Sequence, residues 1–359
     1  MKRINGTTLI EQGWPEGPLI GDALALGRML LGEGLDETDV QAALDRVLTN
    51  PASVAAGEAG HDLAQAVLAE RKRAIPPDVR DAPLEAPIWG RELIDPQAIR
   101  QLENAMRLPV TVAGALMPDA HVGYGIPIGG VVALENAVAP YMVGVDIACR
   151  MMLSVYPGEA TSYLENASRR DKLRKVLRRE TRFGIGAKFG PRERRDHDVL
   201  DDADWNATPL LRSLKDKAHA QLGTSGTGNH FVDVGRLRVD EIGAKVLSIE
   251  PGTYFGILSH SGSRGVGATI ADRYSKQARE VTKLPKDLQA LAWLGLDTEL
   301  GQEYWASMNL AGRFASACHH EIHKALAKEL GLERVADVEN HHNFAWKETW
   351  QGRDVIVHR

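Results

Sequence analysis

Four short segments of the sequence place side chains that can bind metals next to glycine, serine or asparagine. They are VGVDIACRM with Asp146 and Cys149, GTGNHFVDV with His230, LSHSGSRGVG with His260, and ENHHNFAW with His341 and His342. Together they offer a carboxylate, a thiolate and several imidazoles, a mixture that suits divalent manganese, iron, cobalt, nickel or zinc. A bridging cysteine with three histidines and one aspartate could hold two ions, and such a pair can bind a phosphoryl group from both sides.

Each histidine taken alone is weak evidence, because a single histidine near a strand end is more often a hydrogen-bonded core or surface residue. The shared setting raises the odds, since glycine-rich loops at the ends of apolar strands present side chains to ligands. The SGSRG stretch after His260 adds backbone N–H groups, hydroxyls and Arg264, which suit a phosphate group. The GTSGTG run before His230 can admit a nucleotide closely.

The bulk composition describes a chain that can bury a large core. It has 359 residues, of which 43% are hydrophobic and 25% are charged, and its formal net charge is −5. That charge argues against a protein that coats nucleic acid through its overall charge, and leaves room only for a local basic groove. The only cysteines are Cys149 and Cys318, so we expect a reducing, cytoplasmic setting. No apolar run has the length of a signal-peptide core or a membrane span, and we expect no membrane partner.

Two regions of different texture must position these segments. Residues 1–80 predict a helical segment, in which Val40, Leu44 and Val47 share one helical face after an acidic start. Over residues 88–359, strands, glycine-rich turns and helices alternate irregularly. This pattern predicts an α+β domain with a mixed β-sheet or sandwich core surrounded by helices. At its end, we expect two short strands around a Trp-rich connection.

The stretch 169–195 is strongly basic and begins as a predicted helix with Leu173, Val176 and Leu177 on its buried side. A basic helix face is most often simply solvated. The functional alternative is a track for a phosphate backbone, whose binding would weaken with salt.

Five motifs, in this order, resemble the RtcB family of RNA-splicing ligases: MPDAHVGYGIPIGG, VGVDIACRM, GTSGTGNHF, SHSGSRG and HHNFAW. The resemblance covers the chain from about residue 88 to the end and leaves out the N-terminal helical segment. It implies an RtcB-type core and an enzyme of tRNA processing or RNA repair. Such an enzyme joins an RNA end bearing a 2′,3′-cyclic phosphate or 3′-phosphate to a 5′-hydroxyl end. In that family, GTP and manganese convert a histidine into a guanylylated intermediate, and the guanylate then passes to the RNA 3′-phosphate.

The resemblance also implies roles for residues that match the family motifs. Two Mn²⁺ ions would be bound by Asp146, Cys149, His230, His260 and His342, with Cys149 bridging them. The family's ligand is the histidine directly before asparagine, which selects His342 over His341. GTP and its phosphates would contact Asn229, Phe231, Asp233 and Arg264. Asp119 and His121 lie in a family motif near the metals, and with Cys149 they form the expected catalytic set.

Three residues depart from the family pattern near the site. The family usually has glycine on both sides of the cysteine, whereas Ala148 and Arg150 flank Cys149 here. We expect the bulky cation beside the metals to change substrate access. At position 233 the ligases commonly carry glutamate, and Asp233 keeps the charge but shortens its reach toward guanine.

The family's guanylylated histidine lies in a Ser-His-Gly motif, which does not occur in this sequence. The chain stops at Arg359 within a strand pattern, and we expect a catalytic domain that is truncated at its C-terminus. The rival explanation is a natural short form that keeps the metals. His358 is a theoretical substitute nucleophile, although its surroundings match nothing in the family.

Two other functions compete with RNA ligation. A metal-dependent RNA-end phosphatase or cyclic phosphodiesterase would use the same two ions with water as the nucleophile. A non-catalytic protein that binds RNA ends would rely on the basic stretch 169–195. Separately, His319 and His323 are spaced as zinc ligands on a helix. No glutamate completes a zincin motif there, so a structural helix with polar histidines is the favoured reading.

Overall fold

The computed structural model describes residues 4–15, 17–74 and 77–359, and divides the chain into two compact units, Met1–Pro77 and Asp78–Arg359. The first unit is helical, with α1 (Gly6–Glu11), α2 (Pro18–Gly32), α3 (Glu37–Thr49) and α4 (His61–Ala74). Asp36 caps α3 by accepting hydrogen bonds from the backbone N–H groups of Thr38 and Asp39 at 2.8 and 2.9 Å. The predicted face of Val40, Leu44 and Val47 is buried in this unit's own core.

The second unit contains three β-sheets. The first sheet has the order β1-β2-β10-β9, and all its neighbours are antiparallel. Its strands are β1 (Thr111–His121), β2 (Ile128–Glu135), β9 (Ala345–Trp350) and β10 (Arg353–His358). Helix α5 (Pro96–Met106) packs on it through Leu102 and Met106. A small pair, β3 (Ala137–Val138) and β7 (Leu294–Gly295), forms the second sheet.

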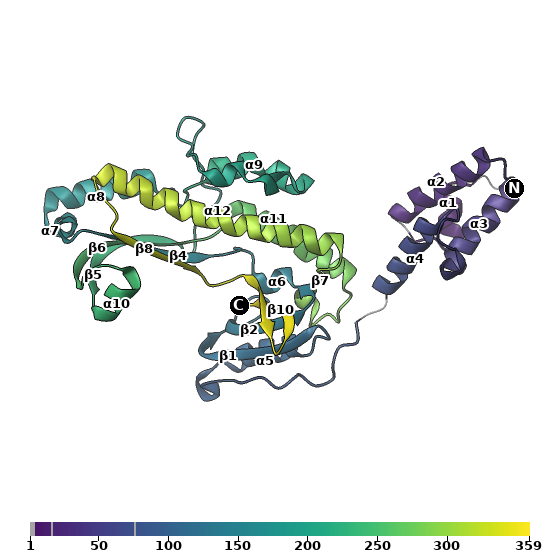
Figure 1. Cartoon of the computed structure of the whole chain (residues 1–359), viewed down its shortest axis with the longest axis horizontal. Helices are drawn as coiled ribbons and strands as arrows, with labels where there is room; N and C mark the ends of the chain where they lie inside the picture. The colour runs from purple at the N-terminus through teal and green to yellow at the C-terminus, as the bar shows by residue number, and fades with distance from the viewer. Residues whose placement is uncertain (1–3, 16, 75–76) are drawn as a thin grey trace. The chain divides into compact units, whose positions relative to one another are not determined.

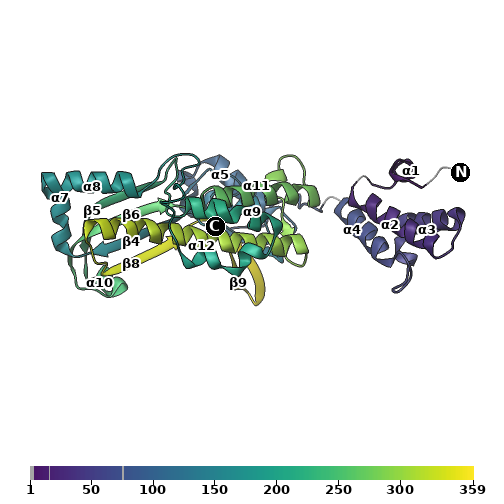
Figure 2. The same ribbon diagram turned by 90° about the horizontal axis from the view of Figure 1, so that it is seen from above.

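The third sheet is the one that carries the candidate metal ligands. Its order is β5-β6-β4-β8, again antiparallel throughout. The strands are β4 (Arg150–Tyr156), β5 (Phe231–Val239), β6 (Gly252–Ser261) and β8 (Ala336–His341). Two helices, α8 (Ala167–Glu180) and α12 (Glu299–Leu330), share a hydrophobic core with it, and Figures 1 and 2 show α12 running along the sheet. The remaining helices are α6 (Pro140–Val143), α7 (Ser162–Glu165), α9 (Pro209–Gln221), α10 (Glu241–Leu247) and α11 (Arg264–Val281).

The α+β class is confirmed, but two details of the prediction are wrong. The named strands form antiparallel sheets where a mixed sheet was expected, because hairpins join neighbours such as β1 with β2 and β9 with β10. The C-terminal stretch forms three strands where two were expected, since the Trp-rich connection is itself strand β9. Gln351 and Gly352, both with positive φ (48° and 77°), make the tight turn that pairs β9 with β10. Over the residues described, no helix is long and apolar enough to cross a membrane.

Candidate metal centre

One end of the third sheet gathers all five expected ligands. Antiparallel neighbours alternate in direction, so β4 and β5 begin where β6 and β8 end. Cys149 directly precedes β4 and His230 directly precedes β5, while His260 lies near the end of β6 and His342 directly follows β8. A turn closed by a hydrogen bond from Cys149 N–H to the Asp146 carbonyl (3.1 Å) brings the carboxylate beside them.

The donor atoms of these side chains converge. Cys149 Sγ lies 3.1 Å from His260 Nε2 and 3.4 Å from His230 Nε2. His260 Nε2 is 3.3 Å from His342 Nε2, and Asp146 Oδ2 is 2.9 Å from His230 Nε2. Within the described ranges, two groups of three donors lie inside 4.8 Å of one another: Asp146, Cys149 and His230, and Cys149, His260 and His342. Both groups contain Cys149, as a bridging thiolate between two ions requires.

The chemistry of this donor set fits divalent metal ions. Asp146 Oδ2 is buried 2.9 Å from His230 Nε2, the ring nitrogen that carries the proton when Arg264 donates to Nδ1. A buried carboxylate, imidazoles and a thiol this close together suit a divalent ion, which binds such groups in their deprotonated forms. Gly262 leaves the space for the Asp146 carboxylate, because a Cβ at position 262 would collide with it.

A hydrogen bond orients the imidazole of His260, and ring stacking orients that of His341. His260 Nδ1 lies 3.1 Å from the carbonyl oxygen of Asn229, which can only accept, so Nδ1 carries the proton. The lone pair of His260 Nε2 therefore faces Cys149 and His342, as a metal ligand's must. His341 stacks on Trp346 with ring centroids 5.0 Å apart and points to a different neighbourhood. This geometry favours His342 as the ligand of the pair.

Burial and charge set the protonation of the acidic groups. Burial and the nearby Asp146 carboxylate raise the pKa of Cys149 far above its usual range, with Arg264 acting in the opposite direction. Burial alone would raise the pKa of Asp146, but His230 and the Arg264 charge hold it below its ordinary value. The pKa of His342 is lowered, first by burial and then by the neighbouring His260. Without a cation the cysteine is thus a neutral thiol beside a charged carboxylate.

Arg264 and the glycine-rich loop lie next to these donors. Arg264 Nη1 donates to His230 Nδ1 at 3.0 Å, while its buried Nε has no partner. Gly226 is needed here, since a Cβ at this position would overlap the Arg264 guanidinium. The hydroxyls of Ser225 and Ser263 are also buried without partners. These unsatisfied donors belong to the glycine-rich loop before His230 and to the start of α11, just after His260.

The other expected site residues lie at different distances from the cluster. The Phe231 ring is 5.6 Å from that of His260, its cross-strand neighbour. Asp233 lies two positions along β5 and is exposed. Asp119 and His121 are exposed at the end of β1, where His121 Nδ1 is 3.2 Å from the Asp119 carbonyl oxygen. Among the described residues, neither of their side chains forms a hydrogen bond or ion pair with the five converging ones.

Arg150 does not stand over the metal ligands as the sequence suggested. Its side chain is buried, with Nη2 donating to the Gly312 carbonyl on α12 at 3.2 Å and Nη1 paired with Glu339 at 3.1 Å. The alternation of side chains along β4 explains this, because Cys149 and Arg150 point to opposite faces. Glu339 also accepts from Ser316 on α12 at 2.8 Å, so Arg150 joins β4, β8 and α12 behind the ligands.

Ala148 adopts a left-handed backbone conformation, with φ at 57°. That conformation favours glycine. This backbone conformation accounts for the glycine that the family whose motifs this sequence resembles usually has before the cysteine.

His319 and His323 form a buried hydrogen-bonded chain that sequence reasoning did not foresee. His319 Nε2 is 3.1 Å from the Ser261 carbonyl oxygen and must donate to it. Its Nδ1 then accepts from the Ser259 hydroxyl at 2.5 Å, and that oxygen accepts from His323 Nε2 at 2.7 Å. His323 Nδ1 in turn accepts from Ser154 at 2.8 Å. The direction of each hydrogen bond in this chain follows from the Ser261 carbonyl, which can only accept. These contacts agree with a structural role for His319 and His323, which the sequence favoured over a zinc site.

His358 is fully buried in the first sheet. Its Nε2 accepts from the backbone N–H of Ala139 at 3.0 Å, and burial lowers its pKa to about 4. An imidazole enclosed in this way is not exposed to a nucleotide.

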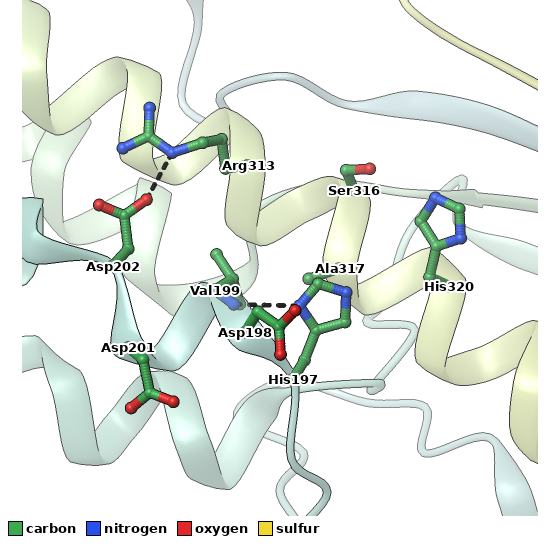
Figure 3. Close-up of a pocket in the computed structure, with 9 residues that line it drawn as sticks. All are labelled: His197, Asp198, Val199, Asp201, Asp202, Arg313, Ser316, Ala317 and His320. Carbon is green, nitrogen blue, oxygen red and sulfur yellow. Dashed lines mark hydrogen bonds and ion pairs between the residues drawn. The ribbon is translucent and has the colours of Figure 1, made fainter.

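Two cavities of the second unit do not coincide with the ligand cluster. One, of about 530 Å³, is lined by residues before α9 and along α12, including His197, Asp202, Arg313 and His320 (Figure 3). Arg313 Nε donates to Asp202 at 2.7 Å there. The other, of about 570 Å³, lies by β9 and β10. Neither cavity is lined by any of the five donors, and we place the site by the convergence of donor atoms.

Comparison with known proteins gives consistent matches. The sequence model of the family described as "tRNA-splicing ligase RtcB" matches residues 101–359. A tRNA-splicing ligase RtcB of Nanoarchaeum equitans is 32% identical over 289 residues, covering 68% of this chain and 60% of the relative. An RNA-splicing ligase RtcB homolog 1 of Entamoeba dispar is 31% identical over 258 residues, covering 62% and 47%. The RNA-splicing ligase RtcB1 of Escherichia coli is 28% identical over 305 residues, covering 76% and 70%. The chain thus spans about half to two thirds of the length of most of these relatives.

Proposed function

Because this chain belongs to the RtcB family, we propose that it serves in joining RNA ends at a centre of two divalent ions. The proposed substrates are an RNA end with a 2′,3′-cyclic phosphate or 3′-phosphate, a 5′-hydroxyl end, and GTP. One observation carries the proposal: five donors from four separate segments converge around a shared cysteine. Manganese is the proposed metal, since the resemblance implies it and the mixed oxygen, nitrogen and sulfur donors admit it.

Each part of the site has a proposed task. The bound ions would offset the negative charge that gathers on a phosphoryl group during transfer. Asp146, Cys149, His230, His260 and His342 would hold these ions. Arg264, with its free buried Nε, is placed to bind a phosphate oxygen beside them. Asn229 orients His260 through its backbone carbonyl, which leaves its side chain for nucleotide contacts. The proposal assigns no residue to guanylylation, because Ser-His-Gly does not occur in the printed sequence.

The proposal is tested with two RNA oligonucleotides, one ending in a 2′,3′-cyclic phosphate and the other starting with a 5′-hydroxyl. Joining that requires Mn²⁺ and GTP is expected from a protein that also carries the family's Ser-His-Gly segment, and it should be abolished there in His260→Ala. The control is His219→Ala, a surface histidine on α9 whose partner is the exposed Asp196. Guanylate-dependent joining that survives His260→Ala contradicts the proposal.

A second candidate is hydrolysis of the cyclic phosphate by the same two ions. It is favoured by the assembled donor set, because two ions that bind a phosphoryl group can also activate a water molecule as the nucleophile. The same assay separates the two candidates. Conversion of the cyclic phosphate to an open phosphate with Mn²⁺ but without GTP or joining supports hydrolysis, and no conversion removes this candidate.

A further inference from the structure

The segment between α8 and α9 exposes two apolar side chains at a glycine-flanked tip. Ile185 is 94% exposed and Phe183 is 50% exposed. Gly184 and Gly186 around them have positive φ values of 114° and 69°, which bend the chain outward. Scattered exposed apolar residues are ordinary on protein surfaces, so only the location of this pair gives it meaning.

The base of this tip is fixed to the glycine-rich loop. The Arg182 carbonyl accepts from Ser225 N–H at 2.9 Å, and Gly184 N–H donates to the Gly226 carbonyl at 2.7 Å. Phe183 forms a parallel bridge with Gly226. Behind the tip, buried Phe189 lies under the guanidinium groups of Arg182 and Arg195, at 5.2 and 4.5 Å from its ring centre. The tip is therefore held in place although its side chains face solvent.

This anchoring places the tip beside the metal centre. Gly226, which pairs with Phe183, is packed so closely on the Arg264 guanidinium that it admits no side chain. Arg264 in turn donates to His230 Nδ1 at 3.0 Å. Only Gly226 and Arg264 thus separate the apolar tip from one of the proposed metal ligands.

Two exposed cations, Lys188 and Arg192, lie in the same segment as the tip. Arg182 at its base is paired with Glu193 at 2.7 Å. A ligand that matches both the apolar tip and the nearby cations has flat apolar rings attached to a phosphate backbone. Unpaired nucleotides have this chemistry, because each base stacks on aromatic or apolar side chains while the backbone is held by cations.

We propose that Phe183 and Ile185 form a platform on which a base next to the reacting RNA end stacks. This inference rests on the proposed function for the identity of the RNA end. A platform of this kind is tolerant of sequence, since every base presents a π-face. Its position two residues from the centre would keep the terminal phosphate facing Arg264 and the metal ligands.

The experiment measures binding of a fluorescent single-stranded RNA with a 3′-phosphate to the full chain with Mn²⁺, for Phe183→Ala, Ile185→Ser and the double variant. We expect Phe183→Ala to raise the Kd about 5- to 100-fold, the range for loss of one stacked base. Phe183→Tyr should bind as the unchanged protein does. The matched control is Ile242→Ala, an isoleucine 75% exposed on α10.

Mn²⁺ and GTP binding are measured on the same variants and are expected to stay unchanged. An unaltered RNA Kd in the double variant overturns the platform, as does a loss of GTP affinity with RNA affinity intact. If the unchanged protein binds the RNA but not Mn²⁺, the proposed function fails while the comparison of variants still decides the platform. If the unchanged protein binds no RNA, both fail.

Discussion

Ser259 connects the two buried histidines behind the metal centre, and Ser259→Ala should destabilise the second unit strongly. In the unchanged protein its hydroxyl donates to His319 Nδ1 and accepts from His323 Nε2. Alanine leaves both ring nitrogens without partners, and both histidines are at most 1% exposed. Each unsatisfied buried polar group costs about 1–3 kcal/mol, so we expect the loss of two partners to lower the free energy of unfolding by about 2–6 kcal/mol.

Urea unfolding followed by tryptophan fluorescence measures this change, with Ser213→Ala as the control. Ser213 is an exposed serine on α9 whose hydroxyl donates only to the Leu210 carbonyl at 2.7 Å. The control should change the free energy of unfolding by less than about 0.5 kcal/mol. A loss below about 1 kcal/mol for Ser259→Ala would refute the directed chain that we derive from the Ser261 carbonyl.

Three further predictions concern the same region. Burial lowers the pKa of His319 to about 4 and of His323 to about 3, against 6.5 ordinarily. The unfolded chain therefore takes up protons near pH 6.5 while the folded one does not. Stability should be complete above that pH and decline by a few kcal/mol as the pH falls toward about 4, measured by urea midpoints across pH. Glu339→Ala leaves the Arg150 guanidinium buried without its carboxylate partner. We expect it to lower the free energy of unfolding by about 1–3 kcal/mol, a moderate loss because Glu339 is partly exposed. Glu348→Ala, which breaks a pair on the surface, should change the free energy of unfolding little. Gly262→Ala should displace the Asp146 carboxylate and weaken Mn²⁺ binding at least about 10-fold, measured by calorimetry. Gly235→Ala, which has open space around it, should leave Mn²⁺ affinity unchanged. Equal Mn²⁺ affinities of the two variants would contradict the role given to Gly262.

The sequence predicts which residues form the site better than it predicts the contacts that hold those residues in place. The four segments stand out because aspartate, cysteine and histidine lie at the ends of apolar strands, and antiparallel pairing brings those ends together. The exact set of five donors, with His342 in place of His341, came from the family resemblance. Helices α3 and α8 were predictable because their apolar spacing is regular and acidic or capping residues start them.

The contacts that could not be predicted involve backbone groups, which every residue type offers, and partner residues far along the chain. Asn229 orients His260 with its backbone carbonyl, which any residue would offer. Arg150 is followed by no acidic neighbour, and its partner Glu339 lies on a strand far along the chain. The Trp-rich stretch does not read as a strand because no alternation of buried and exposed side chains marks β9, whose residues 347–350 are all exposed, and only its pairing with β10 makes it one.

The most direct test of the metal centre is the number of Mn²⁺ ions bound per chain, measured by equilibrium dialysis with metal analysis for the unchanged protein, Cys149→Ala and His219→Ala. Our account predicts two ions in the unchanged protein and in His219→Ala, and loss of tight binding in Cys149→Ala because both donor groups contain its sulfur. An unchanged protein that binds no Mn²⁺ tightly, or a Cys149→Ala variant that still binds two ions, would contradict it.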